Sequence, residues 1–538
     1  MDERPNILLI MADQLRWDYI GAYGKNSWIN TPNIDSLAKE GCLFTNAYSP
    51  NPVCIPARHN LITGLPARFH GFDDNYFGPF AKSCPSSLPT FAEVLSNAGY
   101  NTAAIGKMHF QPERRSTGFD VFLNQDEVVK DISEDEYAQF LIDKGFGNVG
   151  SIHGVRNILY MQPQESLLPE EYHGSCWVAD RTIEYIRSRK TRKKPFLLWT
   201  GFIHPHPPLA LPPSWSHLYD GKVPLPVETK TPVSQITEEN KYNAFFPNIS
   251  VLQRWRELYA CAVSFMDWNV GRILKALEEE NLKENTLVIF VSDHGEMLGD
   301  NGTYQKMLPY DGSAKIPFIV RWPLKIEKGT VRKEFVDLND ILPTFIQLGE
   351  GKYDYGQDLP GESLFSKNPT KDRSFQYIEH QHGSKRWCAL ICEKYKYVHY
   401  YGDRDELYDR INDPDETTNL LYGKDVSYYE PIVSEMKKKL IGLEEKWGLP
   451  GHIDNGDFLK FPPYVAQYRR ERIFPFSMVR DPDSPRLSPI SDEILKAIKN
   501  EPLVKIENLK PEEVLLQQGG FTEKEFKELM EKAKKQGN

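Results

Sequence analysis

The chain has 538 residues, 40% hydrophobic and 12% aromatic, a composition that supports a sizeable folded core and excludes wholesale disorder. Its 65 basic and 75 acidic side chains leave a net charge of −10, which argues against a nucleic-acid or anionic-membrane partner held by bulk charge. No apolar run approaches the roughly 18 residues that span a bilayer, and the seven scattered cysteines are not typical of a disulfide framework.

The N-terminus leads directly into the first apolar run. Residues Met1–Pro5 precede Asn6 without the basic region and longer apolar core of a secretory signal. The chain as given is therefore expected to be cytosolic, whereas a chain whose signal had been removed would be periplasmic or secreted.

Five short apolar runs predict buried strands, with helical stretches between them. The runs are Asn6–Met11, Thr102–Ile105, Phe196–Gly201, Leu287–Ser292 and Phe318–Arg321. One helix is expected to start at Pro32 with Thr31 as its cap and to end at Gly41, and another covers Val251–Glu280. This alternation predicts an α/β fold, with a large mainly parallel sheet sandwiched by helices.

The character of the sequence changes after about residue 370. Short aromatic and β-branched runs predict a small C-terminal antiparallel sheet, and the runs are Phe375–Ile378, Arg386–Ile391, Tyr395–Tyr400 and Leu407–Tyr408. A helix is expected over Tyr428–Trp447, and a last one from about Thr522. The predicted organisation is a catalytic α/β domain over 1–370, a sheet-and-helix subdomain over 371–450 and an extension over 451–538.

Polar residues follow several of the predicted strands. Asp13-Gln14 and Asp293-His294 each come directly after a buried strand, and function in open α/β sheets collects at the carboxyl ends of strands. A single carboxylate at such a position is commonly a helix cap or turn residue. Together, the two carboxylates are expected to converge on a divalent metal, with the amide and the imidazole as neutral ligands.

The most specific local feature surrounds Cys54. Taken alone, a single cysteine is more often a small buried hydrophobe than a reactive group. Cys54, however, lies between prolines at a predicted helix entrance, with Arg58 four residues further on. A helix N-terminus together with a guanidinium stabilises an anionic nucleophile or oxyanion.

These motifs resemble the type I sulfatases of the alkaline phosphatase superfamily. The likeness spans about residues 4–450 and includes Arg4–Gln14, Thr31–Ala38, Cys54–Gly64, Gly106–His109, Pro205–Pro208, Ser292–Gly295, Ile316–Arg321 and Glu406–Asp409 with Asp413-Pro414. It implies hydrolysis of sulfate monoesters by a nucleophile that a formylglycine-generating enzyme makes from Cys54. The implied metal ligands are Asp13, Gln14, Asp293, His294 and the modified Cys54.

The resemblance also implies a role for each remaining site residue. Arg58 would hold the second hydroxyl of the hydrated aldehyde. Lys107 and Lys306 would bind sulfate oxygens as point charges. His206 would protonate the leaving oxygen, and His109 would then take a proton so that sulfate is released and the aldehyde is regenerated.

Two motifs depart from the most familiar family pattern. Asp13-Gln14 stands where many members have consecutive aspartates, and Asp293-His294 where many have Asp-Asn. Calcium is the expected ion, but the imidazole of His294 favours Mn²⁺ or Mg²⁺ more than an all-oxygen site would. Phosphonate monoester and phosphodiester hydrolases share both departures, and choline-sulfatases share some of these motifs. Both groups therefore remain alternatives.

The substrate class is predicted more loosely. The expected substrate is a sulfated carbohydrate or another small sulfate ester, with residues 126–171 and 375–386 as candidate substrate-facing segments. Arg386 could reach the substrate or lie at the surface. Arg469, Arg470 and Arg472 are expected to reach either the substrate or, as the favoured alternative, a partner in a homo-oligomer. A third class, a non-catalytic anion-binding protein, applies if Cys54 is never modified.

Overall fold

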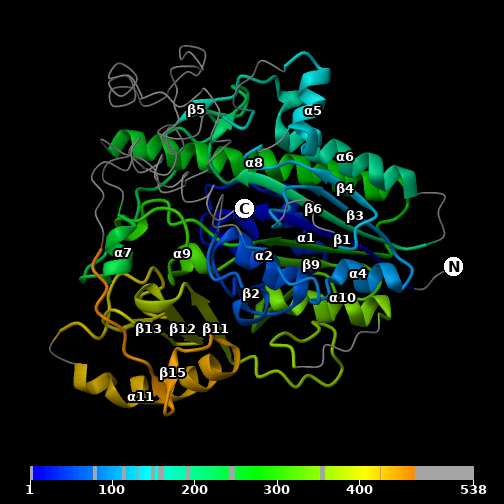
Figure 1. Cartoon of the computed structure of the whole chain (residues 1–538). Coiled ribbons are helices and arrows are strands. Elements are labelled where there is room, and N and C mark those ends of the chain that lie inside the picture. Colours follow the sequence, from blue (N-terminus) through cyan, green and yellow to red (C-terminus); the bar gives the residue numbers. More distant parts are fainter. Residues whose placement is uncertain are drawn as a thin grey trace, which may run out of the picture.

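An eight-stranded sheet runs through the centre of the molecule (Figure 1). The structure, a computed structural model, describes residues 4–76, 82–111, 117–129, 132–146, 152–154, 163–189, 194–241, 249–351, 358–423 and 426–466. The strands are β1 (Asn6–Asp13), β2 (Cys42–Tyr48), β3 (Asn101–Gly106), β4 (Val121–Asn124), β6 (Phe196–Pro205), β8 (Thr286–Ser292), β9 (Phe318–Arg321) and β10 (Thr330–Asp337). Their order is β10-β2-β9-β8-β1-β6-β3-β4, and all pairings are parallel except the two made by β9.

Helices cover both faces of this sheet, as Figure 1 shows. In β1, Leu8 and Ile10 pack into a core formed with α1 (Pro32–Glu40), α6 (Gly174–Arg189) and α8 (Ile249–Glu279). Ile7 and Leu9 point to the opposite face, against α2 (Cys54–Thr63), α4 (Phe91–Asn97) and α10 (Ile341–Gly349). Because successive side chains of a strand alternate between faces, a continuous apolar run is what a doubly covered strand requires. The predicted α/β fold is confirmed.

All five strands predicted for the large sheet are present, and three further strands of that sheet were missed. β4 has only four residues, and β10 exposes alternate side chains along its first half at one edge of the sheet. β2 contains the polar pair Thr45 and Asn46, which interrupts its apolar pattern. The predicted cap of α1 is also different, since the Thr31 hydroxyl donates to the carboxylate of Asp35 (2.9 Å) and makes no cap bond.

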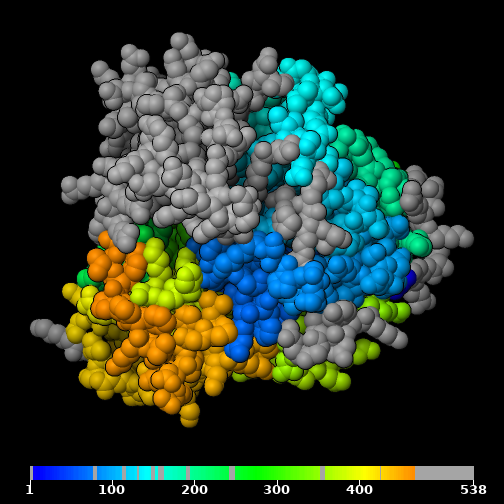
Figure 2. Space-filling model, viewed as in Figure 1, coloured from blue at the N-terminus to red at the C-terminus, as the bar shows by residue number. Residues whose placement is uncertain are grey.

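The predicted C-terminal sheet is confirmed as well. It consists of the antiparallel strands β11 (Phe375–His380), β12 (Trp387–Cys392), β13 (Tyr395–Tyr400) and β14 (Glu406–Asp409). One face packs on α11 (Val426–Trp447) and the other on the catalytic core. Figure 2 shows the yellow and orange C-terminal part lying against the blue N-terminal part. Between these two parts, Arg68 donates to the carbonyl oxygen of Glu445 (2.8 Å). The helix predicted from Thr522 lies outside the described residues.

Arg386 corrects one expectation, because its side chain reaches neither substrate nor solvent. The guanidinium is fully buried and forms ion pairs with Glu379 and with Glu444 of α11 (2.6 Å to the latter). It therefore joins the small sheet to α11. Removing one partner of such a buried pair leaves the other charge uncompensated.

Shorter elements complete the described structure. They are α3 (Ala67–His70), α5 (Glu136–Asp143), α7 (Gln235–Glu239), α9 (Asp311–Ala314), β5 (Gln164–Glu165), β7 (Ala210–Leu211), β15 (Ile453–Asp454) and β16 (Asp457–Phe458). All seven cysteines are free thiols. Among the described helices, none has the length and apolar character to cross a membrane.

Candidate active site

The candidate site lies at the carboxyl ends of the central strands. Asp13 is the last residue of β1, and Asp293 directly follows β8. These strands are parallel neighbours in which Ala12 pairs with Ser292, so the two aspartates leave the sheet side by side. Cys54 is the first residue of α2, which confirms the predicted helix entrance.

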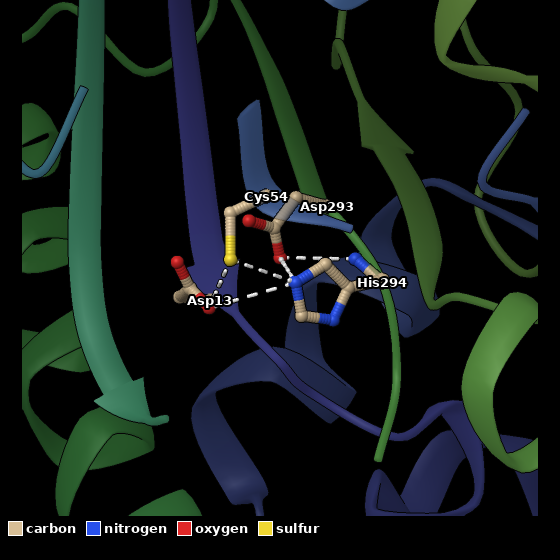
Figure 3. Close-up of side chains that lie close together, drawn as sticks. All are labelled: Asp13, Cys54, Asp293 and His294. Carbon is tan, nitrogen blue, oxygen red and sulfur yellow. Dashed lines mark hydrogen bonds and ion pairs between the residues drawn. The ribbon is translucent and has the colours of Figure 1, made fainter. Parts of the chain in front are cut away.

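Four potential metal ligands converge at this edge. One ligand atom from each of Asp13, Cys54, Asp293 and His294 lies within 4.8 Å of all the others, and every one of these side chains is buried. Figure 3 shows the Cys54 sulfur directed between Asp13 and the His294 ring. The Sγ atom is 3.1 Å from His294 Nε2 and 3.8 Å from Asp13 Oδ1.

The protonation states of this cluster suit metal binding. Burial lowers the pKa of His294 to about 4, and its Nδ1 donates to the carbonyl oxygen of Gly295 (2.9 Å), so Nε2 presents a lone pair to the cluster. Burial opposes ionisation of Asp293, but His294 and Arg58 outweigh it and lower its pKa to about 2. Burial and the Asp13 charge raise the pKa of the Cys54 thiol to about 12. The unmodified thiol is therefore protonated at neutral pH.

Arg58 lies beneath the cluster, one helical turn after Cys54. Its Nε donates to Asp293 Oδ2 and its Nη2 to Asp13 Oδ2, both at 3.0 Å, while Nη1 donates to the carbonyl oxygen of Lys107 (2.7 Å). The side chain is completely buried. The planar guanidinium thus fixes the spacing of both carboxylates, which a lysine could not do with a single ammonium group.

The side chain of Gln14 is held from both ends. Its Nε2 donates to the buried carboxylate of Glu296, while its Oε1 accepts from Lys306 Nζ (2.6 Å). The backbone N–H of Gln14 donates to Asp293 Oδ1 (3.0 Å), and this residue adopts a left-handed φ of 62°. Lys306, which holds the amide oxygen, is buried rather than solvated.

The remaining predicted residues surround a carboxylate that sequence reasoning missed. Lys107, which follows β3, forms ion pairs with Asp13 (2.5 Å) and with Glu127. His206, which follows β6, lies with Nε2 3.5 Å from Glu127, and His109 Nδ1 is 4.0 Å from the same side chain. Glu127 comes shortly after β4. If the sequence pattern had revealed the four-residue strand β4, Glu127 would have been predicted at its carboxyl end, beside the site.

The donor set fits a divalent cation. Two buried carboxylates, one imidazole nitrogen and the thiol position meet in the cluster. Gln14 joins them through its backbone N–H, which donates to Asp293. Burial and the nearby charge of Asp293 oppose ionisation of Asp13, but Lys107, His206 and Arg58 outweigh them and lower its pKa. Both aspartates are therefore anionic at neutral pH, as ligands of a hard cation must be.

Sequence comparison identifies the family. Residues 5–351 match the family described as Sulfatase, and residues 299–446 match the one described as N-sulphoglucosamine sulphohydrolase, C-terminal. The chain therefore belongs to the sulfatase family of sulfuric ester hydrolases, which confirms the predicted resemblance and enzyme class.

Individual relatives agree with this placement. The chain is 32% identical over 490 residues to an arylsulfatase of Clostridium perfringens, covering 86% of this chain and 98% of that one. It is 31% identical over 439 residues to a choline-sulfatase of Rhizobium meliloti, covering 78% and 82%. The solved phosphonate monoester hydrolase of Agrobacterium radiobacter superposes with a TM-score of 0.70 at 23% identity, covering 86% and 100%. This last likeness shows a common fold.

Proposed function

We propose that this sulfatase hydrolyses sulfate monoesters of carbohydrates, using a formylglycine derived from Cys54 and one divalent metal. The observation that carries the proposal is the buried cluster of Asp13, Cys54, Asp293 and His294 at the entrance of α2. The residues that would hold the metal are these four positions with Gln14. The ion would supply positive charge to polarise the sulfate and lower the pKa of a neighbouring hydroxyl.

Formylglycine would supply two hydroxyls in its hydrated form, one as nucleophile and one for releasing sulfate. Around it, Arg58 keeps both aspartates charged and correctly spaced, and its position one turn after residue 54 suits it to hold the second hydroxyl. The cationic Lys107 and Lys306 flank the cluster and would bind the sulfate oxygens. Together they form a local positive pocket in a chain of net charge −10.

Two histidines would manage the protons. His206 follows β6 and is buried beside Lys107 and Glu127, where it would protonate the leaving oxygen. His109 lies on the other side of Glu127 and would take a proton from the remaining hydroxyl. Positioned acid and base groups of this kind each contribute about 10²- to 10⁴-fold in rate.

A substrate panel tests the proposed reaction. We expect turnover of sulfated mono- and oligosaccharides and of aryl sulfates, with lower rates on choline sulfate and on phosphodiesters or phosphonate monoesters. The match of residues 299–446 to a sulphoglucosamine sulphohydrolase supports the sugar class, while the 31% identity to a choline-sulfatase supports the small ester as second candidate. Initial rates measured on equal concentrations decide between them. Phosphodiester or phosphonate turnover without any sulfatase activity would contradict the proposal.

Metal dependence gives a readout independent of activity. Stripping divalent ions with a chelator is expected to lower the melting temperature, and Ca²⁺, Mn²⁺ or Mg²⁺ to restore it, because an ion at 100 times its Kd stabilises the native state by about 2.7 kcal/mol. The ion with the largest effect at equal concentration identifies the preferred metal. Calcium is the proposed one.

The ligand role is tested by the same melting experiment on a variant. Asp293→Asn removes one carboxylate of the cluster and is expected to abolish the metal-induced rise. Asp120→Asn lies just before β4, away from the cluster, and its amide oxygen can still accept from the Thr102 N–H, so it serves as the matched control and should keep the full rise. Equal metal responses of all three proteins would overturn the proposed ligand set.

A further inference from the structure

Glu127 is a buried carboxylate that contacts Lys107, one of the residues proposed to bind sulfate. Only 7% of the residue is exposed, and it lies three residues beyond the end of β4. A carboxylate next to a sulfate site repels the substrate and loses hydration energy, so it needs a compensating function. The roles proposed above for the other site residues do not include it.

Three catalytic candidates surround this carboxylate. Its Oε2 atom forms the ion pair with Lys107 and lies 4.0 Å from His109 Nδ1. Its Oε1 atom is 3.5 Å from His206 Nε2. The two oxygens therefore serve different partners, and Oε1 faces the histidine assigned to the leaving group.

The other nitrogen of His206 determines what Nε2 does. Nδ1 lies 2.6 Å from the carbonyl oxygen of Pro207, which accepts a hydrogen bond, so Nδ1 carries a proton. Nε2 then bears a proton only in the imidazolium form, and a facing carboxylate favours that form. The 3.5 Å separation exceeds the 2.7–3.2 Å of a formed N–H···O bond. Glu127 therefore faces Nε2 as a charge rather than as a hydrogen-bond acceptor.

We propose that Glu127 is a positioning residue that holds His206 as a protonated general acid for the leaving group. The inference rests on the proposed function. In this step the deprotonated hydroxyl oxygen at position 54 forms a bond to sulfur as the bond from sulfur to the leaving oxygen breaks. The leaving oxygen keeps the electron pair and takes the Nε2 proton. His206 is left neutral, and Glu127 stays ionised throughout.

Burial and the surrounding charges act on the protonation of His206 in opposite directions. Burial lowers the pKa of His206 well below its ordinary value, and Glu127 is the strongest charge acting in the opposite direction. Lys306 and Lys107 also lower that pKa, and Asp13 raises it. A bound sulfate would offset the two lysines, so Glu127 and the substrate together favour the imidazolium.

The competing explanation is that Glu127 only balances the charge of Lys107. Its removal would then change sulfate binding equally for all esters, chiefly in KM. An acid-positioning role instead changes kcat/KM according to how much the leaving group needs a proton. The two roles therefore differ in their leaving-group dependence.

Glu127→Gln, which keeps the shape and removes the charge, is the test. We expect kcat/KM to fall roughly 100-fold for sugar and alkyl sulfates, the lower end for general acid catalysis, and only a few-fold for 4-nitrophenyl sulfate, whose leaving phenolate needs no proton. Glu127→Asp should recover part of the loss, and Asp120→Asn should change neither rate. A cooperative melting transition in each variant shows that it folds. An equal fall for all esters, or none, would overturn the inference.

The same series on His206→Gln separates this inference from the proposed function. If kcat/KM of His206→Gln falls much more for esters with poor leaving groups, while kcat/KM of Glu127→Gln falls equally for all esters, only the proposed role of Glu127 is rejected. If kcat/KM of His206→Gln falls equally for all esters, His206 is not the general acid. The proposed role of His206 and that of Glu127 then both fail.

Discussion

Replacing Cys54 by alanine is expected to lower kcat/KM for sulfate esters by about 10⁴-fold or more, because loss of a nucleophile removes the group on which the other catalytic residues act. The Cys54 side chain is the only one of the seven cysteines that lies among the metal-ligand candidates of the described residues. Steady-state rates on an aryl sulfate measure the effect. Cys392→Ser, at a half-buried thiol of the small sheet, is the matched control and should retain full activity.

Mass spectrometry of the peptide containing residue 54 completes this experiment. Active protein should show conversion of Cys54 to formylglycine, and protein made without a modifying enzyme should show a thiol and little activity. Cys54→Ser would offer one hydroxyl but not the second that releases sulfate, so at most one turnover is expected. An unmodified thiol in fully active protein would refute the mechanism.

Replacing Arg58 by alanine is expected to lower the free energy of unfolding by about 3–5 kcal/mol, the usual effect of removing one partner of a buried ion pair. Arg58 donates to both Asp13 and Asp293 and is completely buried, so its loss leaves two carboxylates without their common guanidinium. Urea denaturation of metal-free protein measures the change. Activity should be lost as well, since the aspartates lose their spacing.

Two further variants sharpen this prediction. Arg58→Lys keeps the charge but cannot reach both carboxylates with a planar fork, so an intermediate loss of stability is expected. Arg404→Ala removes an exposed arginine and should stay within about 0.5 kcal/mol of the wild type. If Arg58→Ala were as stable as Arg404→Ala, the aspartates would not need the guanidinium, and its structural role would be refuted.

Local sequence pattern predicted the long buried elements well. The apolar run Asn6–Met11 has only one comfortable environment, a strand covered on both faces, and β1 is that strand. The apolar pattern predicted strands less well where the strand is only partly buried or very short. β10 carries charged residues at an edge, and β4 is too short for a period to be recognised. For the second reason, Glu127 fell within the candidate segment 126–171 but was not singled out as a site residue.

The sequence by itself determined the chemistry that is available. Cys54 at a helix entrance, Arg58 one turn later, and carboxylates directly after strands are local arrangements, and local spacing is enough to recognise them. Tertiary structure alone decided which of these groups meet. His206 and Glu127 are 79 positions apart, and Gln14 and Lys306 are 292 apart. Their contacts arise because parallel strands bring their carboxyl ends to one edge, an order of strands that no single segment encodes.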